Sequence, residues 1–281
     1  MRLGSWGADL SSADLESFID GCVDMGLVDF DHADIYGHYT EEGRFGDVMR
    51  RRPDLKAKLK VTTKCGIKLL TENRPSHKIK SYDSTREHII WSADNSLQQL
   101  GVDRLDVLLL HRPDFLMHPD DIAEAFSQLR SSGKVLHFGV SNFSSSQFEL
   151  LHSVFPLVTH QVEISPLHRS AFKDGTLDQC LKHKIIPTAW SPYGGGRVFN
   201  VPGQDSEHSL NQVLTELSKK YDCQRDQLIL AWLRKHPSGI LPILGTTKIE
   251  RISSAHQSLS ISLTHEDWYR VWEAAEGKEV A

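Results

Sequence analysis

The sequence predicts an α/β fold in which eight parallel strands, each followed by a helix, close into a (β/α)8 TIM barrel. Short apolar runs alternate with amphipathic helical stretches along all 281 residues, at about 35 residues per unit, as in barrels of this kind. The opening strand is not followed by the G-x-G-x-x-G sequence of a doubly wound dinucleotide-binding domain. No linker rich in Pro, Gly or Ser divides the chain, so we expect residues 1–281 to form a single domain.

The predicted strands are runs of four to eight residues rich in Val, Ile or Leu, a pattern typical of parallel strands buried on both faces. They cover residues 2–6, 27–31, 60–64, 104–110, 135–140, 157–163, 185–190 and 240–244. Helices are predicted between them at 12–25, 85–100, 120–132, 144–151, 175–182 and 207–221. Gly101 and Gly133 follow two of these helices, as glycine commonly does at a helix end.

Composition excludes several classes of function. A net charge of -5 and a pI near 6.3 argue against nucleic-acid binding, and no apolar run of about 20 residues predicts a membrane span. No signal peptide is recognisable at the start of the sequence. The four cysteines are not spaced as C-x-x-C and the 15 histidines form no H-E-x-x-H motif. We therefore expect a cytoplasmic protein with reduced cysteines and no metal site.

Ionisable side chains follow several predicted strands at their carboxyl ends, where barrel enzymes carry their catalytic residues. Asp31 ends the second strand, Tyr36 follows five residues later, Lys64 ends the third and His111 follows the fourth. A tyrosine hydroxyl has a pKa of about 10, so it needs a nearby ammonium to release a proton at neutral pH. Taken singly, each residue could be structural, as a loop aspartate or a core histidine, but together they form a coherent acid–base set.

Seven motifs carry a resemblance to a known family. FDHADIYG (30–37), VTTK (61–64), LLLHRPD (108–114), GVSNF (139–143), HQVEISP (160–166), AWSPYGGG (189–196) and GTTKIER (245–251) stand in barrel order. The chain resembles the aldo-keto reductase superfamily from about residue 3 to about residue 273, and within it looks closest to the bacterial YdhF-like oxidoreductases. The resemblance implies NADPH-dependent reduction of aldehydes or ketones. It also implies that Tyr36 is the proton donor, that Lys64 assists it, that Asp31 pairs with Lys64, and that His111 orients the carbonyl.

The same resemblance implies a cofactor site. Ser141, Asn142 and Gln161 match positions that bind the nicotinamide carboxamide, and Trp190 matches the aromatic that stacks on its ring. The loop at 245–251 suits a phosphate, because it combines hydroxyls, a glycine and two cations, which favours NADPH over NADH. The full set of expected cofactor-binding residues is Gly4, Ser5, Trp6, Ser141, Asn142, Gln161, Trp190, Ser191, Gly245, Thr246, Thr247, Lys248 and Arg251.

The chain departs from the family pattern in three places. Ser254 and Ala255 stand where many members have a Glu-Asn pair for the adenine, which leaves the strength of the NADPH preference open. The β-hairpin that many members carry before the first strand is expected to be lacking. A long C-terminal loop is also expected to be absent, which predicts an open substrate pocket.

Two other functions compete with carbonyl reduction. A cofactor-binding regulatory subunit with little turnover, similar to the potassium channel β-subunits, is the alternative. A metal-dependent hydrolase is disfavoured by the lack of a histidine cluster and of paired acids at the strand ends. The expected partner is a small-molecule carbonyl substrate, whose identity the sequence leaves open, with no nucleic acid and no membrane, and the expected oligomeric state is a monomer.

Overall fold

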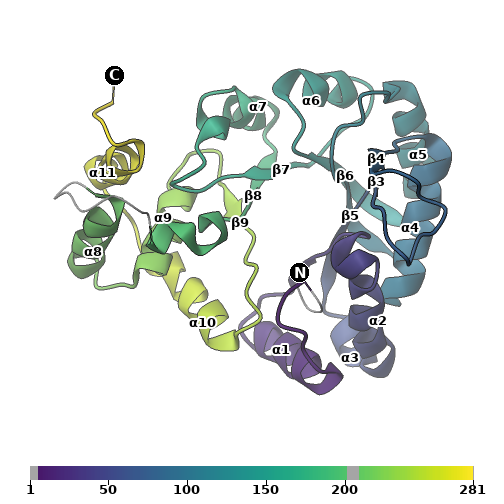
Figure 1. Ribbon diagram of the computed structural model, residues 1–281, viewed down its shortest axis with the longest axis horizontal. Helices are drawn as coiled ribbons and strands as arrows, with labels where there is room; N and C mark the ends of the chain where they lie inside the picture. The colour runs from purple at the N-terminus through teal and green to yellow at the C-terminus, as the bar shows by residue number, and fades with distance from the viewer. Residues whose placement is uncertain (1–5, 201–208, 281) are drawn as a thin grey trace. The chain divides into compact units, whose positions relative to one another are not determined.

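The computed structural model describes residues 6–200 and 209–280, and the chain divides into two compact units (Figure 1). Unit 1 comprises Met1–His160 and Gly245–Ile249. Unit 2 comprises Gln161–Leu244 and Glu250–Ala281. Residues 2–5 of the first predicted strand lie outside the described residues.

Unit 1 contains four parallel strands that pair side by side in chain order: β1 (Asp29–Asp31), β2 (Lys60–Cys65), β5 (Leu105–Leu110) and β6 (Val135–Ser141). In the register of these strands, Asp31 lies opposite Thr62, and Lys64 lies opposite Leu109. The four corresponding predictions are confirmed, although the strand predicted at 27–31 begins only at Asp29. Since neighbouring parallel strands end at the same edge of a sheet, the side chains that follow them meet there.

The helices of unit 1 are α1 (Ser12–Asp24), α2 (Glu41–Arg51), α3 (Pro53–Lys56), α4 (Arg86–Leu100), α5 (Pro119–Ser131) and α6 (Ser145–His152). Figure 1 shows α4 and α5 along one side of β5 and β6. Helix α4 begins after Thr85, whose side chain accepts a hydrogen bond from the His88 N–H, and ends at Gly101 in the left-handed region. The start and the stop that the sequence predicts for this helix are therefore confirmed.

Helix α2 is absent from the sequence prediction, and its packing depends on a glycine. Its buried side chains include Phe45, Val48 and Met49, the spacing of one helical face. A Cβ added at Gly46 would collide with the backbone of Gln99 at the end of α4. The lack of a side chain at Gly46 thus lets α2 and α4 approach closely.

A small antiparallel hairpin of β3 (Ile67–Lys68) and β4 (Ser81–Tyr82) lies in the chain between β2 and α4, with Ile67 opposite Tyr82. The sequence predicts no strand in this part of the chain. Two-residue strands are too short for a periodicity of two to be recognised, which explains the omission.

Unit 2 is mainly helical around a short parallel pair. Strand β7 (Thr159–Glu163) begins in unit 1 and ends in unit 2, and β8 (Ile186–Trp190) pairs with β9 (Leu241–Pro242) through Thr188 and Leu241. The helices are α7 (Thr176–His183), α8 (Leu210–Lys220), α9 (Arg225–Arg234), α10 (Ile249–Gln257) and α11 (His265–Glu276), with short 3-10 turns η2 (Ser170–Phe172), η3 (Gly194–Phe199) and η4 (Ser258–Ser260).

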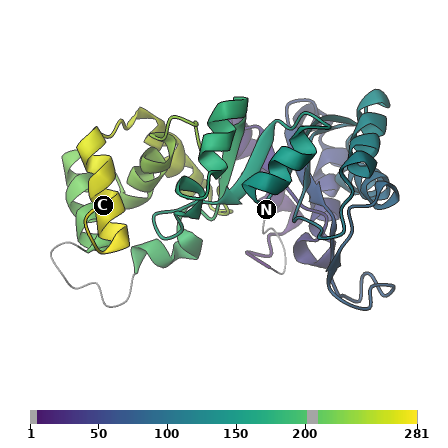
Figure 2. The same ribbon diagram turned by 90° about the horizontal axis from the view of Figure 1, so that it is seen from above.

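Trp232 of α9 is fully buried in the unit 2 core, and the partly buried Trp268 of α11 packs against it. The rings of Trp232 and Trp268 stack with centroids 5.1 Å apart, and each indole N–H donates to the other residue's backbone carbonyl at 3.0 Å. Helices α8 and α11 lie side by side in both views (Figure 2). Within the described parts of the chain, no helix is long and apolar enough to cross a membrane.

Candidate active site

The four predicted catalytic residues all lie in unit 1, at the ends of three neighbouring strands or in the loops that follow them. Asp31 is the last residue of β1, and Tyr36 begins η1 (Tyr36–His38) in the loop that follows. Lys64 is the penultimate residue of β2, and His111 comes directly after β5, where its N–H donates to the Cys65 carbonyl at 2.8 Å. The parallel sheet therefore gathers them at one edge, as the sequence predicts.

Lys64 is the centre of this group. Its side chain is fully buried, and its Nζ donates to Asp31 Oδ2 at 2.5 Å, to the His32 carbonyl at 2.7 Å and to the Tyr36 hydroxyl at 3.4 Å. An ammonium has three N–H donors, and here each has an acceptor. Burial acts to lower the pKa of Lys64, but the charges of Asp31 and Tyr36 and the hydrogen bonds to both raise it above its ordinary value. Lys64 is therefore a buried cation at neutral pH.

His111 is a buried neutral base beside the tyrosine. The His111 and Tyr36 ring centroids are 5.9 Å apart with the rings edge to face. Burial, and after it the positive charges of Lys64 and Arg112, hold the pKa of His111 well below its usual range. Its Nδ1 is buried without a hydrogen-bond partner among the described residues. A neutral imidazole in this position can donate one N–H to an oxygen and adds no charge to the site.

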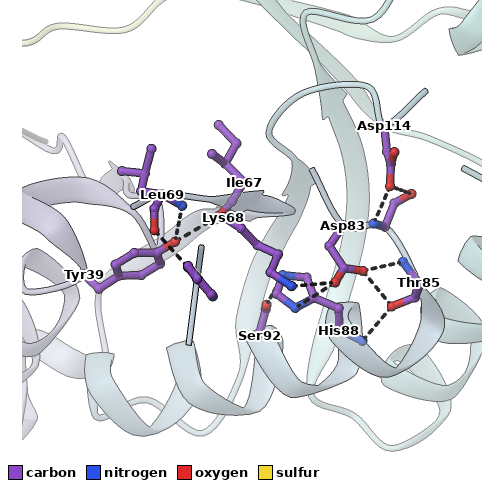
Figure 3. Close-up of polar contacts among 11 residues, drawn as sticks. Tyr39, Ile67, Lys68, Leu69, Asp83, Thr85, His88, Ser92 and Asp114 are labelled. Carbon is purple, nitrogen blue, oxygen red and sulfur yellow. Dashed lines mark hydrogen bonds and ion pairs between the residues drawn. The ribbon is translucent and has the colours of Figure 1, made fainter. Parts of the chain in front are cut away.

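Tyr36 is held by an unusual stretch of backbone. The three residues after it, Gly37, His38 and Tyr39, all have positive φ, at 56°, 56° and 72°. A non-glycine residue in this conformation costs roughly 1–2 kcal/mol, so other contacts must hold the loop. The Tyr39 hydroxyl donates to the Ile67 carbonyl at 3.1 Å and accepts from the Leu69 N–H at 2.9 Å (Figure 3). The β3 end of the hairpin thus fixes the loop that carries Tyr36.

The other end of the hairpin is anchored by Asp83, which Figure 3 shows between Lys68, Thr85 and His88. Asp83 pairs with Lys68 at 3.3 Å and accepts from the Thr85 hydroxyl at 2.7 Å. Lys68 of β3 is thus held by an ion pair to the residue that follows β4. In the loop after His111, Asp114 accepts from the Ser84 N–H at 3.0 Å, which links the loops that follow β2 and β5.

Several expected cofactor residues of unit 1 lie near the same strand ends. Ser141 ends β6 and is buried, and Asn142 follows it with a φ of 60°. The Asn142 amide donates to the Ser141 hydroxyl at 2.6 Å and to the His111 carbonyl at 3.5 Å. Trp6 is exposed, and its ring centroid lies 4.9 Å from that of His38. Gly4 and Ser5 lie outside the described residues.

The predicted phosphate loop precedes α10 without regular structure. Gly245 and Lys248 are exposed, Thr246 and Thr247 are half-buried, and the Lys248 N–H donates to the Thr246 hydroxyl at 3.2 Å. Arg251, in the first turn of α10, is also exposed. Hydroxyls, cations and a helix start are a donor set that fits a phosphate.

The remaining expected cofactor residues belong to unit 2. Gln161 is buried in β7, Trp190 ends β8 with its side chain half-buried, and Ser191 follows with a φ of 52°. A positive φ at a non-glycine residue is often found at functional sites. Within residues 6–200 and 209–280, no group of three or more His, Cys, Asp or Glu side chains could hold a metal ion.

Two buried acids close to Lys64 were missed by the sequence reasoning. Asp34 and Glu42 are almost inaccessible to solvent, and the positive charge of Lys64 acts to lower the pKa of both against the larger effect of burial. Glu42 lies in the first turn of α2, where an acidic residue is commonly found because it favours the helix dipole. Sequence alone therefore gave no reason to single it out.

Comparison with known proteins identifies the family. The family model for the aldo/keto reductase family matches residues 1–276. The chain belongs to the aldo/keto reductase family. It is 43% identical to the oxidoreductase YdhF of Escherichia coli over 99% of this chain and 92% of YdhF, and 37% identical to 6-dehydroglucose reductase of Agrobacterium fabrum over 100% of this chain and 93% of that protein.

A solved structure supports the same fold. An aldo/keto reductase from Klebsiella pneumoniae, in complex with NADP and acetate, superposes with a TM-score of 0.75 at 24% identity, covering 92% of this chain and 84% of that one. The predicted (β/α)8 barrel class, the resemblance to YdhF-like oxidoreductases and the oxidoreductase class of this aldo/keto reductase are therefore confirmed. The roles of individual residues stay predictions.

Proposed function

We propose that this aldo/keto reductase reduces the carbonyl group of small aldehydes or ketones to an alcohol with NADPH, and that Tyr36 donates the proton. The observation that carries the proposal is the fully buried Lys64 ammonium, which donates to both Asp31 and the Tyr36 hydroxyl. A buried cation beside a phenol stabilises the phenolate that remains after proton transfer.

Each residue of the site has a separate role in the proposed reaction. Asp31 and the His32 carbonyl keep Lys64 charged and in place, and Lys64 supports proton release by Tyr36 to the carbonyl oxygen. His111, neutral at pH 7, donates its N–H to the same oxygen and orients it. NADPH, when bound, would supply the hydride to the carbonyl carbon.

Binding of the cofactor is assigned to the predicted set. The nicotinamide is assigned to Ser141, Asn142, Gln161 and Trp190. Gly4, Ser5, Trp6 and Ser191 complete that part of the set. The phosphates are assigned to Gly245, Thr246, Thr247, Lys248 and Arg251, and the two cations of this set favour NADPH over NADH.

The substrate class is proposed from a relative. The 37% identity to 6-dehydroglucose reductase over the whole chain favours an oxidised sugar. We propose that the protein works as a single barrel domain over residues 1–281, as a cytoplasmic monomer acting on small molecules, with neither nucleic acid nor membrane as a partner.

The test is turnover by the purified protein. Loss of NADPH absorbance should follow the addition of 6-dehydroglucose or of simple alkyl and aryl aldehydes, and titration should show saturable quenching of tryptophan fluorescence by NADPH. Binding of NADPH without consumption for any carbonyl would overturn the proposal and favour the regulatory subunit with little turnover. Binding of neither cofactor would overturn the cofactor assignment as well.

The phosphate assignment predicts a selective loss in one variant. Arg251→Ala should weaken NADPH binding about tenfold, because an exposed charged hydrogen bond to a phosphate contributes roughly 1.5 kcal/mol, and it should leave NADH binding unchanged. Fluorescence titration of both cofactors measures this. Arg270→Ala is the control, since Arg270 is an exposed arginine of α11 paired with Glu216 at 2.7 Å. If NADPH binding and NADH binding weaken equally, Arg251 does not recognise the 2′-phosphate.

A further inference from the structure

Glu42 is a buried carboxyl that joins three elements of unit 1, one of which is the strand that carries Lys64. Only 3% of its surface is exposed. Its Oε1 accepts from the Thr63 hydroxyl at 2.5 Å and its Oε2 accepts from the Ser96 hydroxyl at 3.0 Å. Thr63 precedes Lys64 in β2, and Ser96 lies in α4, so the side chain of Glu42 ties α2 to both of these elements.

Charged and titratable groups face Glu42 from neighbouring elements. Lys64 and Cys65 of β2 and Asp34 of the β1 loop interact with it electrostatically, and buried Glu41 precedes it in α2. Burial raises the pKa of Glu42 to about 7, while the two hydroxyls and Lys64 act in the opposite direction. Burial, and next the charge of Glu42, raise the pKa of Asp34 well above its usual range. Glu42 therefore changes charge near neutral pH.

We propose that Glu42 is a positioning residue of carbonyl reduction: its carboxyl fixes β2 next to Lys64, and its charge sets how strongly Lys64 supports the Tyr36 phenolate. This inference rests on the proposed function. Protonated Glu42 leaves Asp31 as the dominant anion at Lys64. Ionised Glu42 adds a second buried negative charge, which competes with the phenolate for the ammonium and disfavours its formation.

Replacement of Glu42 by glutamine separates its charge from its hydrogen bonds. A glutamine can accept from one hydroxyl and donate to the other, because a hydroxyl can play either role. In the wild-type protein, kcat for reduction should fall roughly fivefold as the pH rises from 6 to 8. In Glu42→Gln, this fall in kcat between pH 6 and 8, the pH step, should be absent. Its kcat at pH 6 should equal that of the wild type.

Asp106→Asn is the matched control, because Asp106 of β5 also anchors β2, through the Val61 N–H at 2.8 Å, but three residues before Lys64. It should lower the thermal midpoint and keep the wild-type pH step. A loss of the step in both variants would indicate that any loosening of β2 removes it, and would overturn the role of the Glu42 charge.

Stability against pH gives a second readout that does not require turnover. Since the pKa of Glu42 is raised in the folded protein, its contribution to stability is fully present below its ordinary pKa of 4.5 and is lost as the pH rises through about 7. The thermal midpoint of the wild type should therefore fall more between pH 5 and 8 than that of Glu42→Gln.

The possible outcomes distinguish a failure of the Glu42 inference from a failure of the proposed function. Wild-type turnover with a pH step that persists in Glu42→Gln would overturn the inference and leave the proposed function intact. Absence of carbonyl reduction by the wild type would overturn the proposed function, and with it the role of Glu42 in that reaction, even if the midpoints show that Glu42 titrates. Loss of the step in Glu42→Gln alone, with a flatter stability profile, is the result expected.

Discussion

Tyr36→Phe is expected to abolish carbonyl reduction while leaving NADPH binding nearly unchanged. The phenyl ring keeps its edge-to-face packing on His111, and its centroid stays 5.1 Å from Lys64 Nζ. The substitution therefore removes only the hydroxyl that donates the proton. A general acid typically contributes a factor of about 10²–10⁴ to the rate, and kcat should fall by that amount. Turnover under saturating NADPH and a fluorescence titration of the same sample measure the two quantities.

The effect on folding should be small, because the Lys64 to Tyr36 hydrogen bond is long, at 3.4 Å, and Lys64 keeps its bonds to Asp31 and His32. We expect a loss of no more than about 1 kcal/mol in the free energy of unfolding. Tyr82→Phe, in strand β4 of the same unit, is the control and should retain wild-type turnover. Weakened NADPH binding together with unchanged turnover in Tyr36→Phe would reject Tyr36 as the acid.

The regular parts of the fold follow from local patterns in the sequence. Strand β5 is predicted from an apolar run, which is typical of a strand buried on both faces, and α4 is predicted from its amphipathic pattern and its stop at Gly101. Helix α2 was missed because its closest contact, at Gly46, depends on where α4 lies, and a glycine inside a helical pattern weakens the prediction of a helix. Local periodicity in the sequence does not predict long-range packing of this kind.

Some residues of the candidate site were predictable from the sequence, and others were not. Asp31, Tyr36, Lys64 and His111 stand at strand ends, so strand prediction and side-chain chemistry together single them out. Tyr39 was missed because its role depends on a backbone with positive φ and on the hairpin carbonyl at Ile67, neither of which is recognisable from sequence. The burial of Asp34 is likewise a tertiary effect, since an aspartate in a loop is ordinarily solvated.

Lys64→Met is expected to unfold the protein more easily as well as to inactivate it. Methionine fills a similar volume, but the Asp31 carboxylate and the His32 carbonyl lose the ammonium that both contact. Breaking a buried ion pair costs roughly 3–5 kcal/mol, and the cost here should lie near 3 kcal/mol because the Asp31 side chain remains 18% exposed to water. Urea unfolding measures the loss, and kcat should fall at least about 10²-fold.

The double variant Asp31→Asn/Lys64→Met distinguishes the structural from the catalytic contribution of the pair. Once the charge of Asp31 is removed as well, this side chain no longer needs a cation, so the double variant should be more stable than Lys64→Met by about 1–3 kcal/mol. Turnover should not return, because without an ammonium nothing at this position supports the Tyr36 phenolate. Recovery of reduction together with stability would mean that Lys64 serves only to neutralise Asp31, and the acid–base role assigned to it would then be wrong.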